Sequence, residues 1–230
     1  MKIKLSLLAA AAVLATGGAA FAQDDSSPKL SFNVGAATDY VFRGVSQTDE
    51  NPEIYGGADL TAGQFYAGVW ASNVDFNDST DAEVDLYAGV RPTLGPVSLD
   101  LGAIYYGYVN EPSAANWAYW EIKAAGSLPL GKATLGAAVY YSPDATGPTD
   151  ESALYYEANA AVPLTDKISV SGALGRQTYE DSADYTTWNL GVGFALNDHI
   201  GLDVRYWDTD EHGFGDIYDS RVVAGIKATF

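Results

Sequence analysis

The 230-residue chain contains no cysteine, one methionine and two histidines. Without cysteine there are no disulfide bonds, so the fold depends on backbone hydrogen bonds and on burial. Basic residues are also scarce, because 12 Lys and Arg stand against 30 Asp and Glu and give a formal net charge of −18. Phosphate contacts need basic side chains, and this balance therefore excludes nucleic-acid binding.

The first 22 residues have the three parts of a secretory signal peptide. Two lysines begin the segment, an apolar stretch follows at 5–13, and Ala20-Phe21-Ala22 precedes Gln23 as a small-x-small cleavage site. We therefore expect cleavage between Ala22 and Gln23, which removes both lysines and leaves a net charge of −20. The remaining chain has the length of one domain. It has no run of 18 apolar residues, so no transmembrane helix is predicted.

What the chain does have is alternation. From Leu30 to Phe230, apolar residues recur at every second position in twelve segments that are separated by Gly, Pro and polar turn residues. The last segment, 221–230, is the clearest case, with apolar residues at its even-numbered positions and a terminal aromatic residue. The sequence predicts about twelve strands over 30–230, preceded by a short periplasmic segment at 23–29.

The predicted connections alternate in length. Short ones lie at 61–63, 93–96, 129–132, 163–167 and 197–199, and long ones lie near 44–52, 73–82, 109–116, 142–152, 179–186 and 208–219. An even strand number with short turns at one end and long loops at the other is typical of bacterial outer-membrane barrels. We therefore expect an all-β, transmembrane, antiparallel up-and-down barrel with short periplasmic turns and long acidic extracellular loops.

A soluble antiparallel sandwich or a lipocalin-like barrel would also place its charges on one face. The secretory signal, the terminal Phe and the small, evenly spread apolar faces favour a membrane barrel instead. Aromatic residues at the strand ends point the same way, because membrane barrels carry two interfacial aromatic girdles. The predicted girdle residues are Tyr40, Phe42, Tyr105, Trp120, Tyr141, Trp188 and Tyr206 toward the long loops, and Phe32, Phe65, Phe194 and Phe230 toward the short turns.

Three sequence blocks carry a family resemblance. NVGAATDYVFRGVSQT at 33–48 resembles the opening of the TorF-like porin family, also called the Gcw_chp domain family. GQFYAGVWASNVD at 63–75 and EVDLYAG at 83–89 look like its next blocks, although they are more generic barrel sequence. The resemblance extends over the mature chain. It implies a small outer-membrane barrel that passes small solutes, and it implies no catalytic residues.

The polar faces of the predicted strands line the interior and mix acidic with basic residues. Asp39 and Arg43 lie four residues apart on one face, and Asp203 and Arg205 lie two apart. Such charges serve either as structural ion pairs that hold the wall or as a field that orients a solute. The interior aromatic residues either fill space or form a stacking track. The predicted pore-lining residues are Asp39, Arg43, Tyr66, Trp70, Asp85, Tyr87, Arg91, Glu121 and Lys123.

The long loops contain 17 acidic residues and no Lys or Arg. These acids form a cation-attracting vestibule, bridge to lipopolysaccharide through divalent cations, or simply keep the loops solvated. The run 208–219 partly resembles a calcium loop. Its fifth position is His212 and no helices flank it, so Asp208, Asp210, Asp216 and Asp219 are weak candidates and no metal is predicted.

These features together predict a porin in the outer membrane of a Gram-negative bacterium. It is expected to pass small hydrophilic solutes passively, with a preference for cations, and to need no cofactor. Twelve strands lie between the solid eight-stranded and the open sixteen-stranded barrels, so the pore is expected to be narrow. The expected partners are outer-membrane lipid and lipopolysaccharide, small polar solutes, and the barrel-assembly machinery through Phe230.

Two other classes of function stay open. One is a closed structural or surface-interaction barrel, which would not conduct. The other is a membrane-embedded lipid-modifying enzyme, for which His212, Glu211 and Ser220 are the available side chains. A residue set without geometry is weak support for catalysis, and the sequence therefore predicts that the protein is not an enzyme.

Overall fold

The computed structural model of the protein describes residues 27–145 and 151–230. The predicted signal peptide at 1–22 and the cleavage site between Ala22 and Gln23 lie outside the described residues. The first strand begins at Lys29, within the segment that was expected to precede the barrel.

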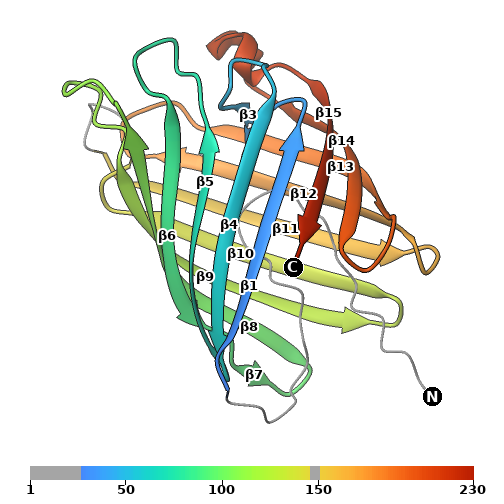
Figure 1. The fold of residues 1–230 in the computed structure, drawn as a ribbon. Coiled ribbons are helices and arrows are strands. Elements are labelled where there is room, and N and C mark those ends of the chain that lie inside the picture. The colour runs from blue at the N-terminus through green and yellow to red at the C-terminus, as the bar shows by residue number, and fades with distance from the viewer. Residues whose placement is uncertain (1–26, 146–150) are drawn as a thin grey trace.

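Strands form wherever apolar and polar residues alternate, because one face of each strand meets a different environment from the other. The main sheet has thirteen strands, of which the two-residue β7 (Thr93–Leu94) only extends a turn. The twelve others are β1 (Lys29–Ala37), β4 (Glu53–Ala62), β5 (Phe65–Asn73), β6 (Ala82–Val90), β8 (Val97–Val109), β9 (Tyr119–Leu130), β10 (Ala133–Ser142), β11 (Ala153–Pro163), β12 (Ile168–Tyr179), β13 (Tyr185–Ala195), β14 (Ile200–Thr209) and β15 (Arg221–Thr229). Figure 1 shows them as long, tilted strands around a common axis.

Each of these strands pairs antiparallel with its neighbours in sequence, and the first strand pairs with the last. At this closing seam Asn33–Ala37 align with Gly225–Thr229, and Phe32 and Phe230 exchange two backbone hydrogen bonds of 3.1 and 2.9 Å. The ring has no open edge, which is how a barrel satisfies every strand. The predicted all-β, twelve-stranded, up-and-down barrel is confirmed.

The outer face of the barrel is apolar and the inner face is polar. Along β6, Leu86 is exposed on the outside while Asp85 and Tyr87 are buried inside. Ile54 and Leu190 are 69% and 61% exposed on the outer face, whereas Glu121 and Arg205 are each 2% exposed within the barrel. This arrangement is the reverse of a soluble barrel, which hides its apolar residues inside.

Most of the aromatic residues expected at the strand ends lie on the outer face. Tyr105, Trp120, Tyr141, Tyr206, Phe32, Phe65, Phe194 and Phe230 are exposed, and Trp188 is half-buried. Their placement in two membrane interfaces stays a prediction.

Tyr40 and Phe42 were expected on this face, and the expectation is wrong. The first strand does not continue to Phe42; it ends at Ala37, and the chain turns into the barrel. There it forms a small hairpin from β2 (Val41–Phe42) and β3 (Val45–Ser46). Tyr40 is buried, and Phe42 packs against the ring of Tyr106 at 5.9 Å.

The segment 38–52 is called the inward hairpin below. Its tip is a two-residue turn in which Arg43 and Gly44 both have positive φ, at 50° and 87°. A tight turn of this kind normally takes Asn-Gly or Gly-Gly, because a side chain is disfavoured at positive φ. The partners of Arg43 inside the barrel hold it there.

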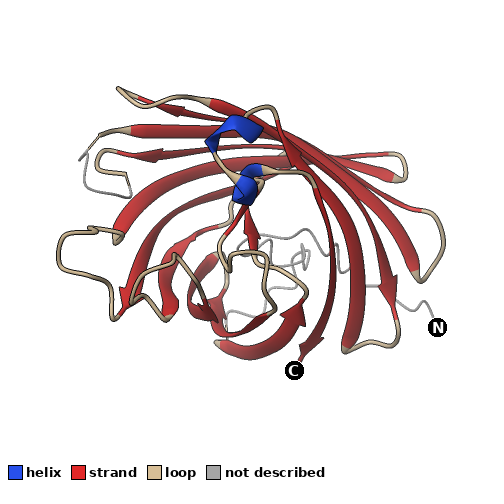
Figure 2. Ribbon diagram, turned by 90° about the horizontal axis from the view of Figure 1, so that it is seen from above, coloured by secondary structure: helices blue, strands red, loops and turns tan. Residues whose placement is uncertain are grey.

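The last long connection, between β14 and β15, contains two single-turn helices, η1 (His212–Phe214) and η2 (Asp216–Tyr218). In the view from above they lie at the long-loop end of the barrel, where η2 contacts β3 of the inward hairpin (Figure 2). Among the helices of the described residues, none is long and apolar enough to cross a membrane.

Candidate functional site

The tip of the inward hairpin is fixed to the opposite wall by Arg43. Its two terminal nitrogens donate to the two carboxylate oxygens of Glu121 on β9, each at 2.8 Å. A third hydrogen bond of 3.1 Å reaches Gln177 on β12, and Tyr106 also donates to Glu121, at 2.9 Å. Because Arg43 and Glu121 are 6% and 2% exposed, this bidentate ion pair is shielded from water.

Aromatic rings enclose the guanidinium of Arg43. Its central carbon lies 4.3 Å from the ring centre of Tyr155, 4.6 Å from that of Phe42 and 4.9 Å from that of Tyr140. A cation close to a ring face is attracted by the ring quadrupole, most strongly where water is excluded. The enclosure therefore holds Arg43 in one place rather than leaving it free in the lumen.

Gly44, the second residue of the tip, touches the wall at β13 and β14. A Cβ at this position would lie 2.2 Å from the hydroxyl oxygen of Thr187 and 2.8 Å from a methyl carbon of Thr209. The hairpin starts between β1 and β4, and Thr209 and Thr187 lie on the second and third strands beyond β1, whereas Glu121 on β9 lies farther round the ring. The hairpin thus crosses the lumen and obstructs it.

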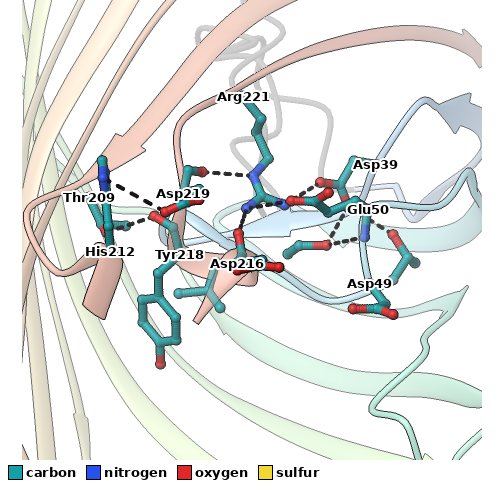
Figure 3. Close-up of polar contacts among 12 residues, drawn as sticks. Asp39, Asp49, Glu50, Thr209, His212, Asp216, Tyr218, Asp219 and Arg221 are labelled. Carbon is teal, nitrogen blue, oxygen red and sulfur yellow. Dashed lines mark hydrogen bonds and ion pairs between the residues drawn. The ribbon is translucent and has the colours of Figure 1, made fainter. Parts of the chain in front are cut away.

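The base of the inward hairpin is held by a second arginine, Arg221 at the start of β15 (Figure 3). Arg221 donates to a carboxylate oxygen of Asp39 at 2.9 Å and pairs with Glu50 at 3.4 Å. It also donates to the backbone oxygens of Asp216 at 2.7 Å and Asp219 at 3.0 Å. One guanidinium therefore joins the inward hairpin to the last long loop.

Asp39 and Arg43 do not pair with each other, although the sequence places them four residues apart. Asp39 accepts hydrogen bonds from Arg221, from Ser46 at 2.7 Å and from Thr48 at 2.9 Å. Both charges lie on the hairpin rather than on a strand, so their local spacing does not set their partners. Asp203 and Arg205, by contrast, do pair, at 3.1 Å on β14.

Three carboxylates lie next to the inward hairpin on β4 and β6. Glu53, Glu83 and Asp85 are each less than 7% exposed. Tyr40 of the hairpin donates to Glu83 at 2.9 Å, and Ser72 donates to Glu53 at 3.4 Å. Within the described residues, neither carboxylate oxygen of Asp85 has a hydrogen-bond donor.

A second group of charges lies closer to the short-turn end. Asp100 accepts from Lys123 at 2.8 Å, from Arg91 at 3.3 Å and from the hydroxyl of Tyr66 at 2.6 Å. The guanidinium of Arg91 stacks over the ring of Tyr66 at 3.9 Å. This wall therefore contains both signs of charge, held in a structural network.

Two interior tyrosines, Tyr66 and Tyr87, lie along the wall. A Cβ on Gly68 would be 2.4 Å from the ring of Tyr87, and one on Gly89 would be 2.6 Å from the hydroxyl of Tyr66. Each ring thus covers a glycine on a neighbouring strand. The hydroxyl of Tyr87 then reaches Asp59 at 2.7 Å.

All nine predicted pore-lining residues lie inside the barrel. Asp39 and Arg43 come from the inward hairpin, and the other seven come from β5, β6, β9 and the turn after β6. Arg91 and Trp70 are half-buried and the rest are buried. Their part in conduction stays a prediction. The pore-lining set did not include Gln177, Thr187 or Arg221, which hold the hairpin.

In the acidic run 208–219, two of the weak candidates for metal binding accept hydrogen bonds from protein groups. Asp208 accepts from Tyr206 at 2.7 Å and from His212 at 2.8 Å, and Asp210 accepts from the backbone of Thr186. Within 27–145 and 151–230, no three acidic or histidine side chains are arranged to hold a metal ion.

His212 contacts carboxylates on both ring nitrogens. Beyond Asp208, its second nitrogen lies 3.7 Å from Asp219. The hydrogen bond to Asp208 raises the pKa of His212 above its usual value, and Asp219 adds to the effect. These contacts do not place a serine hydroxyl on the imidazole, which the enzyme alternative would need.

Residues 21–230 match the family described as "Bacterial protein of unknown function (Gcw_chp)". No curated protein sequence matches the chain.

Several solved structures share the fold. The KdgM porin is 9% identical, with 87% of this chain and 99% of that chain covered and a TM-score of 0.60. The NanC porin is 11% identical, with 88% and 99% covered and a TM-score of 0.57. The COG4313 outer membrane channel from Pseudomonas putida F1 is 8% identical, with 90% and 96% covered and a TM-score of 0.55. At these identities the likeness concerns the fold alone.

Proposed function

We propose that this chain, which belongs to the Gcw_chp family, is a channel for passive diffusion of small hydrophilic solutes across a Gram-negative outer membrane. In this proposal the long acidic loops face outward and the short turns face the periplasm. The inward hairpin sets the width of the lumen. The TorF-like porin designation, which the Gcw_chp match does not include, is part of this proposal.

The observation that carries the proposal is the opposite polarity of the two barrel faces. Leu, Ile, Val and Phe side chains are exposed over the whole outer wall, far beyond the isolated apolar patches of soluble proteins. Inside, the wall carries ion pairs such as Lys123–Asp100 and Arg205–Asp203. A polar interior within a lipid-facing barrel is the arrangement of a water-filled passage.

We further propose that the channel prefers cations. Glu53, Glu83 and Asp85 are buried along the lumen, and in the described part of the chain no basic side chain forms an ion pair with any of them. The long loops add acidic residues without Lys or Arg. Carboxylates along a passage favour cations, and an acidic mouth raises the local concentration of cations.

The proposed partners follow from the outer surface. Outer-membrane lipid contacts the apolar wall, and lipopolysaccharide meets the acidic loops through divalent cations. Phe230 is 68% exposed at the end of the closing strand, where the barrel-assembly machinery has access to it.

A closed barrel is the second candidate function, and one observation favours it. The Arg43–Glu121 pair and Tyr106 are almost inaccessible to water, so the lumen is obstructed at the hairpin. A closed barrel would act through its surface and would conduct no ions.

Conductance in planar lipid bilayers separates the two functions. The purified barrel is compared with a variant in which residues 40–47 are replaced by a short Gly-Ser linker. We expect a small cation-favouring conductance for the native chain and a larger one for the variant. A variant that folds but does not conduct would contradict the channel proposal. A reversal potential that favours anions would contradict only the cation preference.

A further inference from the structure

Glu83 and Asp85 lie two residues apart on the inner face of β6, so both side chains point into the barrel. They are 2% and 0% exposed. An ionised carboxylate only accepts hydrogen bonds, and each such group needs donors when it is buried. The hydrogen-bond donors around Glu83 and Asp85 therefore decide whether both can be ionised.

Among the described residues, Glu83 has donors and Asp85 has none. The hydroxyl of Tyr40 donates to Glu83 at 2.9 Å, and Tyr108 is a second partner of the same carboxylate. Both oxygens of Asp85 are buried without a donor, yet its carboxyl group lies within hydrogen-bonding reach of Glu83. Two acceptor-only groups can bond to each other only when one of them carries a proton.

In the part of the chain that the structure describes, the surroundings of the pair supply no positive charge that is free to replace this proton. Tyr40 faces it from the inward hairpin, Glu53 from β4, Tyr106 and Tyr108 from β8, and Tyr119 and Glu121 from β9. From β5, the facing residues are Trp70 and Ser72, which carry no charge. The nearby Arg43 is paired with Glu121, and Arg221 is paired with Asp39.

A metal ion is a less suitable counter-charge than a proton. Over 27–145 and 151–230, no three acidic or histidine groups converge as metal ligands, and this includes Glu53, Glu83 and Asp85. A single proton between two carboxyl groups needs no coordination shell and no extra space.

We propose that Glu83 and Asp85 hold one proton between them, and that release of this proton frees the inward hairpin and widens the lumen. The inference rests on the proposed channel function and names its regulation. When the carboxylic O–H bond breaks, the proton passes to water and two adjacent carboxylates remain beside Glu53. Like charges without solvent repel each other and favour hydration. Water reaches them when Tyr40, and the hairpin with it, moves away, so rising pH opens the lumen.

The lack of native cysteine allows the hairpin position to be measured by thiol labelling. Val45 of β3 is 8% exposed, so a Val45→Cys thiol should react with a hydrophilic maleimide only when the hairpin leaves the wall. The same reaction at Asp198→Cys, in an exposed short turn, gives the reference rate. The ratio of the two rates cancels the pH dependence that thiol reactivity itself has.

We expect this ratio to rise with pH, by about tenfold per pH unit where one released proton is coupled to opening. Asp85→Asn and Glu83→Gln keep the shape of the pair and supply a fixed donor, so both variants should hold the ratio low at every pH. Asp49→Asn is the matched control. It removes the same charge at an exposed hairpin position whose positive φ of 49° suits Asn, and it should behave as the native chain does.

Infrared difference spectroscopy tests the proton itself. The native barrel should show the carbonyl band of a protonated carboxylic acid that disappears as the ratio rises, and the Glu83→Gln/Asp85→Asn double variant should lack this band. A native ratio independent of pH, an unchanged pH dependence in Asp85→Asn, or identical spectra for the native and double-variant barrels would each overturn the proposal. The barrel could conduct at no pH while the labelling ratio still rises with pH in the native chain and stays low in the Glu83 and Asp85 variants. In that case the channel proposal fails and the shared proton stands.

Discussion

The ion pair between Arg43 and Glu121 should control how often the inward hairpin leaves the wall. Glu121→Gln keeps the side-chain shape and one acceptor but removes the charge that neutralises Arg43. Removing one partner of a buried ion pair costs about 3–5 kcal/mol. Gln177 and three aromatic rings remain around Arg43, so we expect the low end of this range, about 3 kcal/mol.

This free energy corresponds to roughly a hundredfold increase in the fraction of released hairpin, since about 1.4 kcal/mol is a factor of ten. The labelling rate of Val45→Cys relative to the exposed reference measures this fraction directly. In a bilayer, the same change should appear as a larger open fraction of single barrels. The difference in gel mobility between the folded and the unfolded protein shows whether the variant still forms a closed barrel.

A double-mutant cycle separates the ion pair from a general loss of packing. Arg43→Met leaves Glu121 charged and unpaired, and should release the hairpin as Glu121→Gln does. In the Arg43→Met/Glu121→Gln variant neither charge remains, so the combined effect should be clearly smaller than the sum of the two. Additive effects, or a folded Glu121→Gln variant with the labelling rate of the native chain, would refute the reasoning.

Three further predictions concern other parts of the barrel. Gly68→Ala places a Cβ 2.4 Å from the ring of Tyr87 and should lower the free energy of unfolding in detergent by about 1–3 kcal/mol. Gly201→Ala is the control, because the atom nearest to its Cβ is 4.0 Å away and the free energy of unfolding should change little. Equal effects of the two substitutions would show that the Tyr87 ring does not need a glycine at position 68. Leu190→Arg on the outer wall should lower the free energy of unfolding in a lipid bilayer by about 2–4 kcal/mol. Leu164→Arg, in a short turn, should lower it by only about 0–1 kcal/mol. Equal losses of stability in the two variants would argue against a lipid-facing wall. The pKa of His212 is raised in the folded loop, so its stabilising contribution is complete below the unfolded pKa and is lost as pH rises through the folded one. Hydrogen exchange over 209–219 should therefore speed up across that range beyond its intrinsic pH dependence, and His212→Asn should remove this excess.

The barrel itself could be predicted because its strands repeat one simple pattern. In β15 the apolar residues occupy every second position, and the outer face follows directly from that spacing. Twelve such segments with alternating short and long connections leave little choice of topology.

The inward hairpin could not be predicted from the same pattern. Tyr40 and Phe42 continue the alternation of β1, and period two cannot distinguish a lipid-facing strand from one that packs among aromatic rings inside the barrel. Arg43-Gly44 was the available signal, since Gly in a two-residue connection favours a tight hairpin turn. Arg is unusual in the first position of such a turn, so the sequence did not predict a hairpin there.

The individual ion pairs could not be predicted either, because their partners are far apart in the sequence. Arg43 and Glu121 are separated by 78 residues, and Arg221 and Asp39 by 182. Acidic residues outnumber basic ones, so composition shows that some carboxylates lack a basic partner but does not show which. That Asp85 is one of them depends on the register of β5, β6 and β8, which only the closed ring defines.

The seam between β1 and β15 has a consequence for the order of events in biogenesis. Its two halves are the first and last strands of the sheet, so a sheet that lacks this pairing has two edges with unpaired backbone groups. Closure of the ring joins strands at the two ends of the described chain, and contacts of such long sequence separation form slowly. Until that step both edges present N–H and C=O groups that can pair with another chain, and closure removes this liability.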